Sequence, residues 1–377
     1  MPGPKRAGRF EVAEIVRAHR AELESKHTLS REQKRVLTDI GNCRTAALGG
    51  HLDRCIDCGY ERPSYNSCRN RHCPKCQALA QEKWIERQRE RMLACRYFHV
   101  VFTMPKQLRP LGAFAPRVVY EALLHAASRT LIELADTRLK ATIGVTTILH
   151  TWTRKLTFHP HAHALVSGGG LSHDGKTWRK ARRKFLFPVK VMGLLLRGKI
   201  MDALRIAHRR GDFEGFEDFR DPEGFACLLR SVAALPWHVY AKTSFSNGEQ
   251  VLQYLGRYTH RVGISNSRLL DVSARHITFR TKGDGAETIT PVEFLRRLVQ
   301  HVLPSGFHKI RHYGLHASAD KRAQAAALIP LRRRVIKKKS SEPALSDFTV
   351  FYCPHCGATL IQEPLPLARA PPESIAA

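Results

Sequence analysis

A dense run of potential metal ligands near the N-terminus places the strongest constraint on how this chain can fold. Two C-x-x-C pairs, Cys55–Cys58 and Cys73–Cys76, lie a short loop apart. Each such pair places two sulfurs about 2.3 Å from one zinc ion, so the chain around them must fold to bring thiolates together. Eight candidate zinc ligands fall within 34 positions: Cys43, His51, Cys55, Cys58, Cys68, His72, Cys73 and Cys76.

The spacing of these ligands fits either one zinc ion or two. The simplest interpretation is that the four thiolates of the two pairs converge on one structural ion. Cys43, His51, Cys68 and His72 would then suffice for a second ion, although both histidines could equally be exposed. A further pair, Cys353 and Cys356, lacks two ligands unless His355 or a remote residue joins it. Cys95 and Cys227 are interpreted as ordinary core residues.

The charge of the chain indicates a polyanionic partner. It carries 62 Lys and Arg residues against 33 Asp and Glu, a formal net charge of +29, with a pI near 10.2. This excess goes beyond what solubility requires and favours nucleic acid. We expect Arg69, Arg71 and Lys75, which lie among the cysteines, to contact DNA phosphates. The alternative is that the cysteine module is only a structural staple with solvated arginines.

Hydrophobic patterning predicts an α+β fold without a membrane span. No apolar run approaches the roughly 18 residues that a spanning helix needs. The N-terminus has no apolar segment typical of a secretory signal, so we expect a cytoplasmic, nucleoid-associated bacterial protein with reduced thiols. Helices are predicted within 10–42, where Ser30 and Gln33 form a capping box, and after Thr290.

Three regions are expected along the chain. Residues 1–94 would form a helical, zinc-binding, DNA-docking domain. Residues 95–316 would form an α+β core, whose strand candidates GVTTILHTW and LTFHPHAHALVS could pair as an antiparallel hairpin. Within this core, a basic helical insertion is predicted at about 176–235. Residues 317–377 would be a basic, partly disordered tail that carries the last C-x-x-C pair.

Two histidines in the run HPHAHALVSGGG are candidate metal ligands. His161 and His163 are two positions apart on a predicted strand, so they share a face and can bind one ion. His159 lies on the same face, but four positions span about 13 Å along a strand, too far for easy chelation by all three. The alternative is a row of histidines on an exposed sheet face. A third ligand is therefore sought elsewhere.

The run QYLGRYTHR is predicted to form a helix that presents two tyrosines. Tyr254 and Tyr258 are four residues apart and form one stripe with Gln250, the first choice for the third ligand, ahead of His260. A phenol with a pKa near 10 is a weak nucleophile at neutral pH, so it needs help from a base or from positive charge. Arg257 and Arg261 could supply that charge. The alternative is that both tyrosines are amphipathic packing residues with no chemical role.

These motifs make the chain similar to the rolling-circle transposases of the insertion-sequence-91 family, within the HUH endonuclease superfamily. The resemblance runs from about residue 30 to 316. It is carried by CRTAALGGHLDRCIDCGY, YNSCRNRHCPKCQ, FHVVFTMP, TFHPHAHALVSGGGL, QYLGRYTHRVGISNSRLL and HYGL. It implies a ferredoxin-like or RRM-like antiparallel sheet, with the histidine strand central and the tyrosine helix beside it. Ala162 stands where the superfamily prefers a bulkier apolar residue, which leaves the histidine geometry intact.

The chemistry that the resemblance implies is cleavage and rejoining of single-stranded DNA. His161 and His163 would hold a catalytic Mg²⁺ or Mn²⁺, and Tyr254 and Tyr258 would be the two nucleophiles. One tyrosine would nick an element end and keep the 5′ phosphate, and the second would enable strand transfer to target DNA. No small-molecule cofactor is expected, and the sequence gives no oligomeric state.

Two other functions remain open from the residues alone. A plasmid relaxase or a rolling-circle replication initiator would use the same chemistry. A non-catalytic, zinc-containing DNA-binding protein would use the basic segments and cut nothing.

Overall fold

An antiparallel sheet forms the centre of the molecule. The structure is a computed structural model that describes residues 10–182, 186–219, 221, 223–245, 263–330 and 351–365. The strands are rich in Val, Ile, Thr and aromatic residues, which fit a pleated and buried surface. In spatial order they are β11 (Ile310–Gly314), β4 (Ala141–Trp152), β5 (Phe158–Ser172), β3 (Tyr97–Thr103) and β7 (Val239–Phe245), with β6 (Trp178–Lys180) beside β5.

The pairing of β5 confirms the antiparallel hairpin predicted from the sequence. It lies between β4 and β3 and pairs antiparallel with both. The pairing of β4 with β5 is the predicted hairpin between GVTTILHTW and LTFHPHAHALVS. The mixed helix and antiparallel-sheet fold agrees with the expected α+β class.

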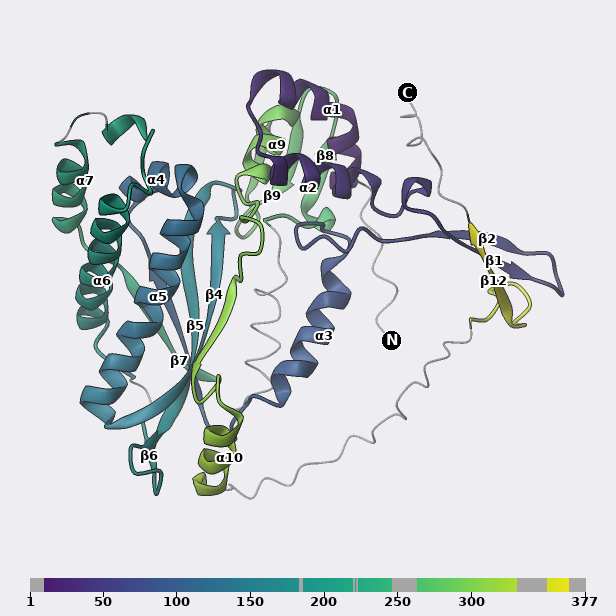
Figure 1. Ribbon diagram of the computed structural model, residues 1–377. Coiled ribbons are helices and arrows are strands. Elements are labelled where there is room, and N and C mark those ends of the chain that lie inside the picture. Colours follow the sequence, from purple (N-terminus) through teal and green to yellow (C-terminus); the bar gives the residue numbers. More distant parts are fainter. Residues whose placement is uncertain are drawn as a thin grey trace.

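Helices cover one face of this sheet (Figure 1). The basic segment predicted as an insertion supplies two of them, and its long helix begins directly after Pro188 as expected. Its apolar residues join the largest hydrophobic core, so this segment is part of the folded layer. The helices are α4 (Arg109–Phe114), α5 (Pro116–Leu134), α6 (Val189–Arg209) and α7 (Gly224–Ala233).

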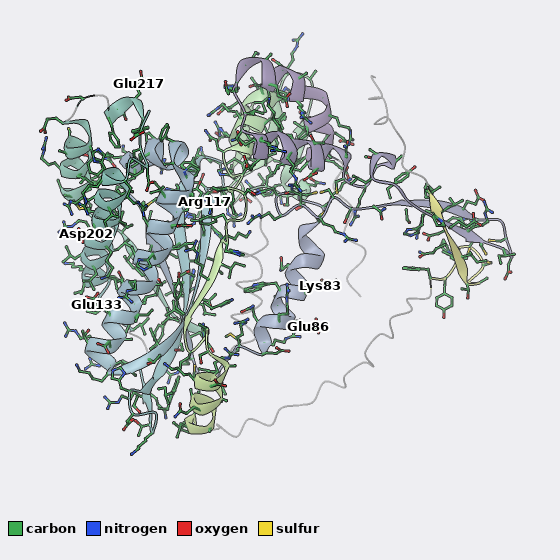
Figure 2. The ribbon with its side chains drawn as sticks, viewed as in Figure 1. Lys83, Glu86, Arg117, Glu133, Asp202 and Glu217 are labelled. Carbon is green, nitrogen blue, oxygen red and sulfur yellow. The ribbon has the colours of Figure 1, made fainter. Side chains whose placement is uncertain are left out.

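The opposite face carries a smaller apolar cluster beside α3 (Gln77–Arg89). Trp84 of this helix packs with Ile148 and Leu165 of the sheet. Figure 2 shows Lys83 of α3 on the other side of the sheet from Glu133 of α5. The two faces are therefore covered by different parts of the chain, and the α3 face is the one that bears the histidines discussed below.

A second core joins the two N-terminal helices to residues far along the chain. The capping box is confirmed: Gln33 N donates to Ser30 Oγ at 3.2 Å, and Ser30 N donates to Gln33 Oε1 at 2.9 Å. Thr290 caps α9 by accepting from Glu293 N, also as predicted. The shared core crosses the domain boundary expected near residue 94. Its elements are α1 (Val12–Lys26), α2 (Arg31–Asn42), α9 (Pro291–Val299), β8 (Leu269–Val272), β9 (Ile277–Arg280) and β10 (Ala286–Ile289).

The third unit is a small sheet formed from both ends of the described chain. It lies apart from the central sheet (Figure 1) and has the order β12 (Leu360–Leu365), β1 (Gly50–Cys55), β2 (Glu61–Tyr65). Within the expected tail at 317–377, α10 (Ala319–Leu328) packs near β5, and β12 pairs with β1. Within the described residues, no helix is long and apolar enough to cross a bilayer.

Candidate metal centre and cysteine groups

Three histidines meet on the α3 face of the central sheet. His150 of β4 is the direct register partner of His161 of β5, and His163 lies two positions further along β5. Register partners share a face, as do residues two apart on a strand, so all three rings project together. One nitrogen from each ring lies within 4.8 Å of the others. This spacing allows the three imidazoles to bind one divalent ion.

Hydrogen bonds fix the orientation of two of these rings. His161 Nδ1 lies 2.7 Å from the carbonyl oxygen of His159, so Nδ1 must donate and the Nε2 lone pair stays available. His163 Nδ1 lies 2.7 Å from Nε2 of His99, and the two rings are parallel within 1°. A ligand histidine commonly donates its second nitrogen to such a partner, which holds the ring in place.

Burial favours the neutral form of His161 and His163. His150 and His163 are buried, with 3% and 7% of their surface exposed, and the ring of Trp152 stacks on His150. Burial lowers the pKa of His161 and lowers that of His163 well below its usual value, with His150 adding to the latter effect. Neutral imidazoles offer lone pairs to a metal ion. The donor set and its charge state therefore fit a divalent cation.

His159 lies next to this group and outside it. Its Nδ1 accepts a hydrogen bond from the Arg109 guanidinium at 2.8 Å. This agrees with the expectation that His159 is not an easy third ligand. The residues first considered for that role, Gln250 and His260, lie outside the described residues.

Sequence reasoning missed His150, although a signal for it existed. In the run GVTTILHTW, alternation places Thr146, Ile148 and His150 on one face of a strand. Alternation does not give the register of the predicted hairpin. A register that pairs His150 with His161 brings His150 into the histidine group. Metal binding by His161 and His163 remains a prediction, to which the geometry adds His150. The predicted nucleophiles and their basic neighbours, Tyr254, Tyr258, Arg257 and Arg261, lie outside the described residues.

The cysteines form two groups of four. One group takes both cysteines of the second C-x-x-C pair, and the other takes both cysteines of the first. The expected convergence of the two pairs on one ion is therefore wrong. Strand β2 separates them and spans about 17 Å at 3.3 Å per residue. The groups are Cys43, Cys68, Cys73 and Cys76, and Cys55, Cys58, Cys353 and Cys356.

The two histidines offered as zinc ligands belong to neither cysteine group. His51 Nε2 lies 3.4 Å from an oxygen of Asp53. His72 Nε2 accepts from Leu303 N at 3.4 Å, and burial lowers the pKa of His72 to about 3. Both correct the sequence-based assignment, because each group already offers four sulfurs, the number of ligands that a tetrahedral zinc site takes.

The basic residues of the cysteine module differ in whether their side chains already bond to other parts of the protein. Arg71 donates to the carbonyl oxygen of Phe307 at 2.7 Å, and Lys75 pairs with Glu11 at 2.6 Å. Arg69 is exposed, with a positive φ of 53°. DNA contact by these residues stays a prediction, and the geometry favours Arg69.

Comparison with known proteins decides the family. The domain described as "Transposase zinc-binding domain" matches residues 15–104, and the one described as "Putative transposase" matches residues 144–324. The chain is 40% identical over 366 residues to the putative transposase y4qJ of Sinorhizobium fredii, covering 94% of this chain and 92% of the relative. The chain belongs to the insertion-sequence-91 family of transposases.

A second relative of this insertion-sequence-91 transposase supports the same conclusion. The chain is 30% identical over 297 residues to the transposase for insertion sequence element IS801 of Pseudomonas savastanoi pv. phaseolicola, which covers 75% of this chain and 70% of the relative. No solved structure matches the chain. The family indicates an enzyme that processes DNA, and its zinc-binding domain with the cysteine groups supports structural zinc.

Proposed function

We propose that this insertion-sequence-91 family transposase is an HUH-type endonuclease that nicks and rejoins single-stranded DNA through a 5′-phosphotyrosine intermediate, in rolling-circle transposition. The observation that carries the proposal is the convergence of His150, His161 and His163 on one sheet face. Three converging imidazoles, two of them oriented by hydrogen bonds, in a chain with a net charge of +29 suit a metal site that acts on a phosphate.

The donor set favours Mn²⁺ over Mg²⁺ as the catalytic ion. Mg²⁺ prefers oxygen ligands, whereas imidazole suits transition metals. When bound, the ion would polarise the scissile phosphate and hold it in position. His99 and the carbonyl of His159 keep the rings of His163 and His161 aimed at that position.

The nucleophiles are assigned from sequence to Tyr254 and Tyr258. In the proposed step the phenol of one tyrosine gives up its proton, and its oxygen attacks phosphorus and forms the new P–O bond. The bond from phosphorus to the 3′ oxygen breaks, and that oxygen takes a proton and leaves as a 3′ hydroxyl. The phosphotyrosine keeps the 5′ phosphate and conserves the bond energy for rejoining. In the reverse step a DNA 3′ hydroxyl attacks the phosphotyrosine, forms a phosphodiester and releases the tyrosine as its phenol. The second tyrosine would enable this strand transfer to target DNA. Arg257 and Arg261 would offset the charge that builds up on the phosphate.

A nicking assay on single-stranded DNA carrying an element end tests this proposal. We expect a covalent protein–DNA adduct with Mn²⁺, weaker adduct formation with Mg²⁺, and none from the double variant Tyr254→Phe, Tyr258→Phe. The matched control is Tyr240→Phe, since Tyr240 is an exposed tyrosine on β7 of the same sheet. An adduct that survives the double change, or that disappears only in Tyr240→Phe, refutes the assignment.

The role of His150 has its own test. His150→Ala should abolish Mn²⁺-dependent adduct formation, as His161→Ala does. His159→Ala is the control, because the carbonyl that orients His161 belongs to the main chain and is retained. Equal loss in His159→Ala, or full activity in His150→Ala, would rule out His150 as the third ligand.

A further inference from the structure

The C-x-x-C segments at the two ends of the described chain have the same local structure. Cys55 N donates to Tyr60 O at 2.8 Å, and Gly59 N donates to Cys55 O at 3.1 Å. In the second segment Cys353 N donates to Ala358 O at 2.7 Å, and Gly357 N donates to Cys353 O at 2.9 Å. Each segment turns at a glycine with positive φ, +72° in the first and +78° in the second. Both are therefore turns of the kind that present two sulfurs to one zinc ion.

The four sulfurs of these segments face one another. Cys55 Sγ lies 3.4 Å from Cys356 Sγ, and Cys58 Sγ lies 3.5 Å from Cys353 Sγ. Ligands about 2.3 Å from a tetrahedral zinc ion lie roughly 3.8 Å apart, close to these separations. Disulfide sulfurs would be only about 2.05 Å apart. The arrangement therefore fits four thiolates around one ion.

A polar network independently joins the same two parts of the chain. Asp53 of β1 is 1% exposed, and its oxygens accept from Arg62, Ser64 and, at 2.8 Å, from Gln362 of β12. On the outer side, Arg54 pairs with Glu363 at 3.1 Å. A buried carboxylate needs such partners. Residues of β12 thus complete the hydrogen bonding of β1, in addition to the sulfurs.

We propose that Cys55, Cys58, Cys353 and Cys356 hold a second structural zinc ion, separate from that of Cys43, Cys68, Cys73 and Cys76. The matched zinc-binding domain ends at residue 104 and so contains only half of these ligands. The ion links residues 295 positions apart, from Cys58 to Cys353. It closes the chain into a loop and fixes residues 351–365 on the N-terminal hairpin. The proposal concerns zinc content alone and is independent of the nicking chemistry.

Zinc analysis of the purified full chain tests the proposal. We expect two zinc ions per chain in the parent protein and one in each of two double variants, Cys55→Ser with Cys58→Ser and Cys353→Ser with Cys356→Ser. Cys95→Ser and Cys227→Ser are matched controls, because both cysteines lie outside the two groups. A parent protein with one ion, or a Cys353→Ser, Cys356→Ser variant that keeps two, overturns it.

A conservative variant separates loss of a ligand from loss of folding. Cys356→His keeps a donor at that position, so it should still bind two Co²⁺ ions in place of zinc, with weaker thiolate-to-cobalt absorption than the parent. Cobalt absorption identical to that of the parent protein would show that Cys356 is not a ligand and would overturn the proposal.

Discussion

The contact between His99 and His163 leads to a quantitative prediction for His99→Leu. His99 is 3% exposed, and its Nε2 lies 2.7 Å from His163 Nδ1. Leucine has similar bulk and removes the hydrogen-bond partner that orients the His163 ring. Loss of such a partner of a metal-binding histidine lowers metal affinity about 10- to 100-fold, or roughly 1.4 to 2.8 kcal/mol. We therefore expect Mn²⁺ to bind 10- to 100-fold more weakly, as measured by calorimetric titration.

The matched control for this prediction is His316→Leu. His316 is also buried, at 1% exposed, and its Nδ1 bonds Thr146 Oγ1 at 2.9 Å on β4. Thr146 lies four positions from His150, about 13 Å along the strand. His316→Leu should lower thermal stability as His99→Leu does while leaving Mn²⁺ affinity unchanged. Equal weakening in both variants, or parent-like affinity in His99→Leu, would refute the orienting role of His99.

Three further predictions concern stability. Burial lowers the pKa of His301 to about 4 and that of His316 to about 3, so the unfolded state binds more protons below pH 6.5. Stability should be constant above pH 6.5 and fall by about 2 kcal/mol per histidine at pH 5; urea midpoints that do not change with pH contradict this. Thr290→Ala removes the cap of α9 and should cost about 1 kcal/mol by urea unfolding, whereas Thr290→Ser should be close to the parent protein. Gly144→Ala places a Cβ 2.3 Å from the His316 ring and should lower the free energy of unfolding by roughly 1 to 3 kcal/mol in the parent protein. The loss should be smaller in a protein that also carries His316→Ala, and additive losses would argue against this clash.

Features encoded by neighbouring residues were predictable from sequence. The capping residues Ser30 and Thr290 identify helix starts because their hydrogen bonds span three positions. The strand with His161 and His163 was recognisable because side chains two apart share a face. The fold class and the histidine pair followed from such local rules.

Features that depend on distant pairing were not predictable. His150 joins the histidine group only through the register of β4 on β5, which alternation within one strand leaves undetermined. Cys353 and Cys356 reach Cys55 and Cys58 only because β12 pairs with β1. Cysteine spacing within one segment does not give connectivity, so the sequence alone favours the nearer Cys73 and Cys76 as partners.

The pairing of β12 with β1 has a consequence for synthesis of the protein on the ribosome. Strand β1 ends at Cys55, and its register partner Leu360 is made about 305 residues later. At 5 to 20 residues per second, the nascent hairpin of β1 and β2 waits roughly 15 to 60 s for its third strand. During that interval one edge of β1 is open to other strands. A copy of the gene interrupted before residue 353 would leave Cys55 and Cys58 without their partners permanently, however intact the upstream sequence.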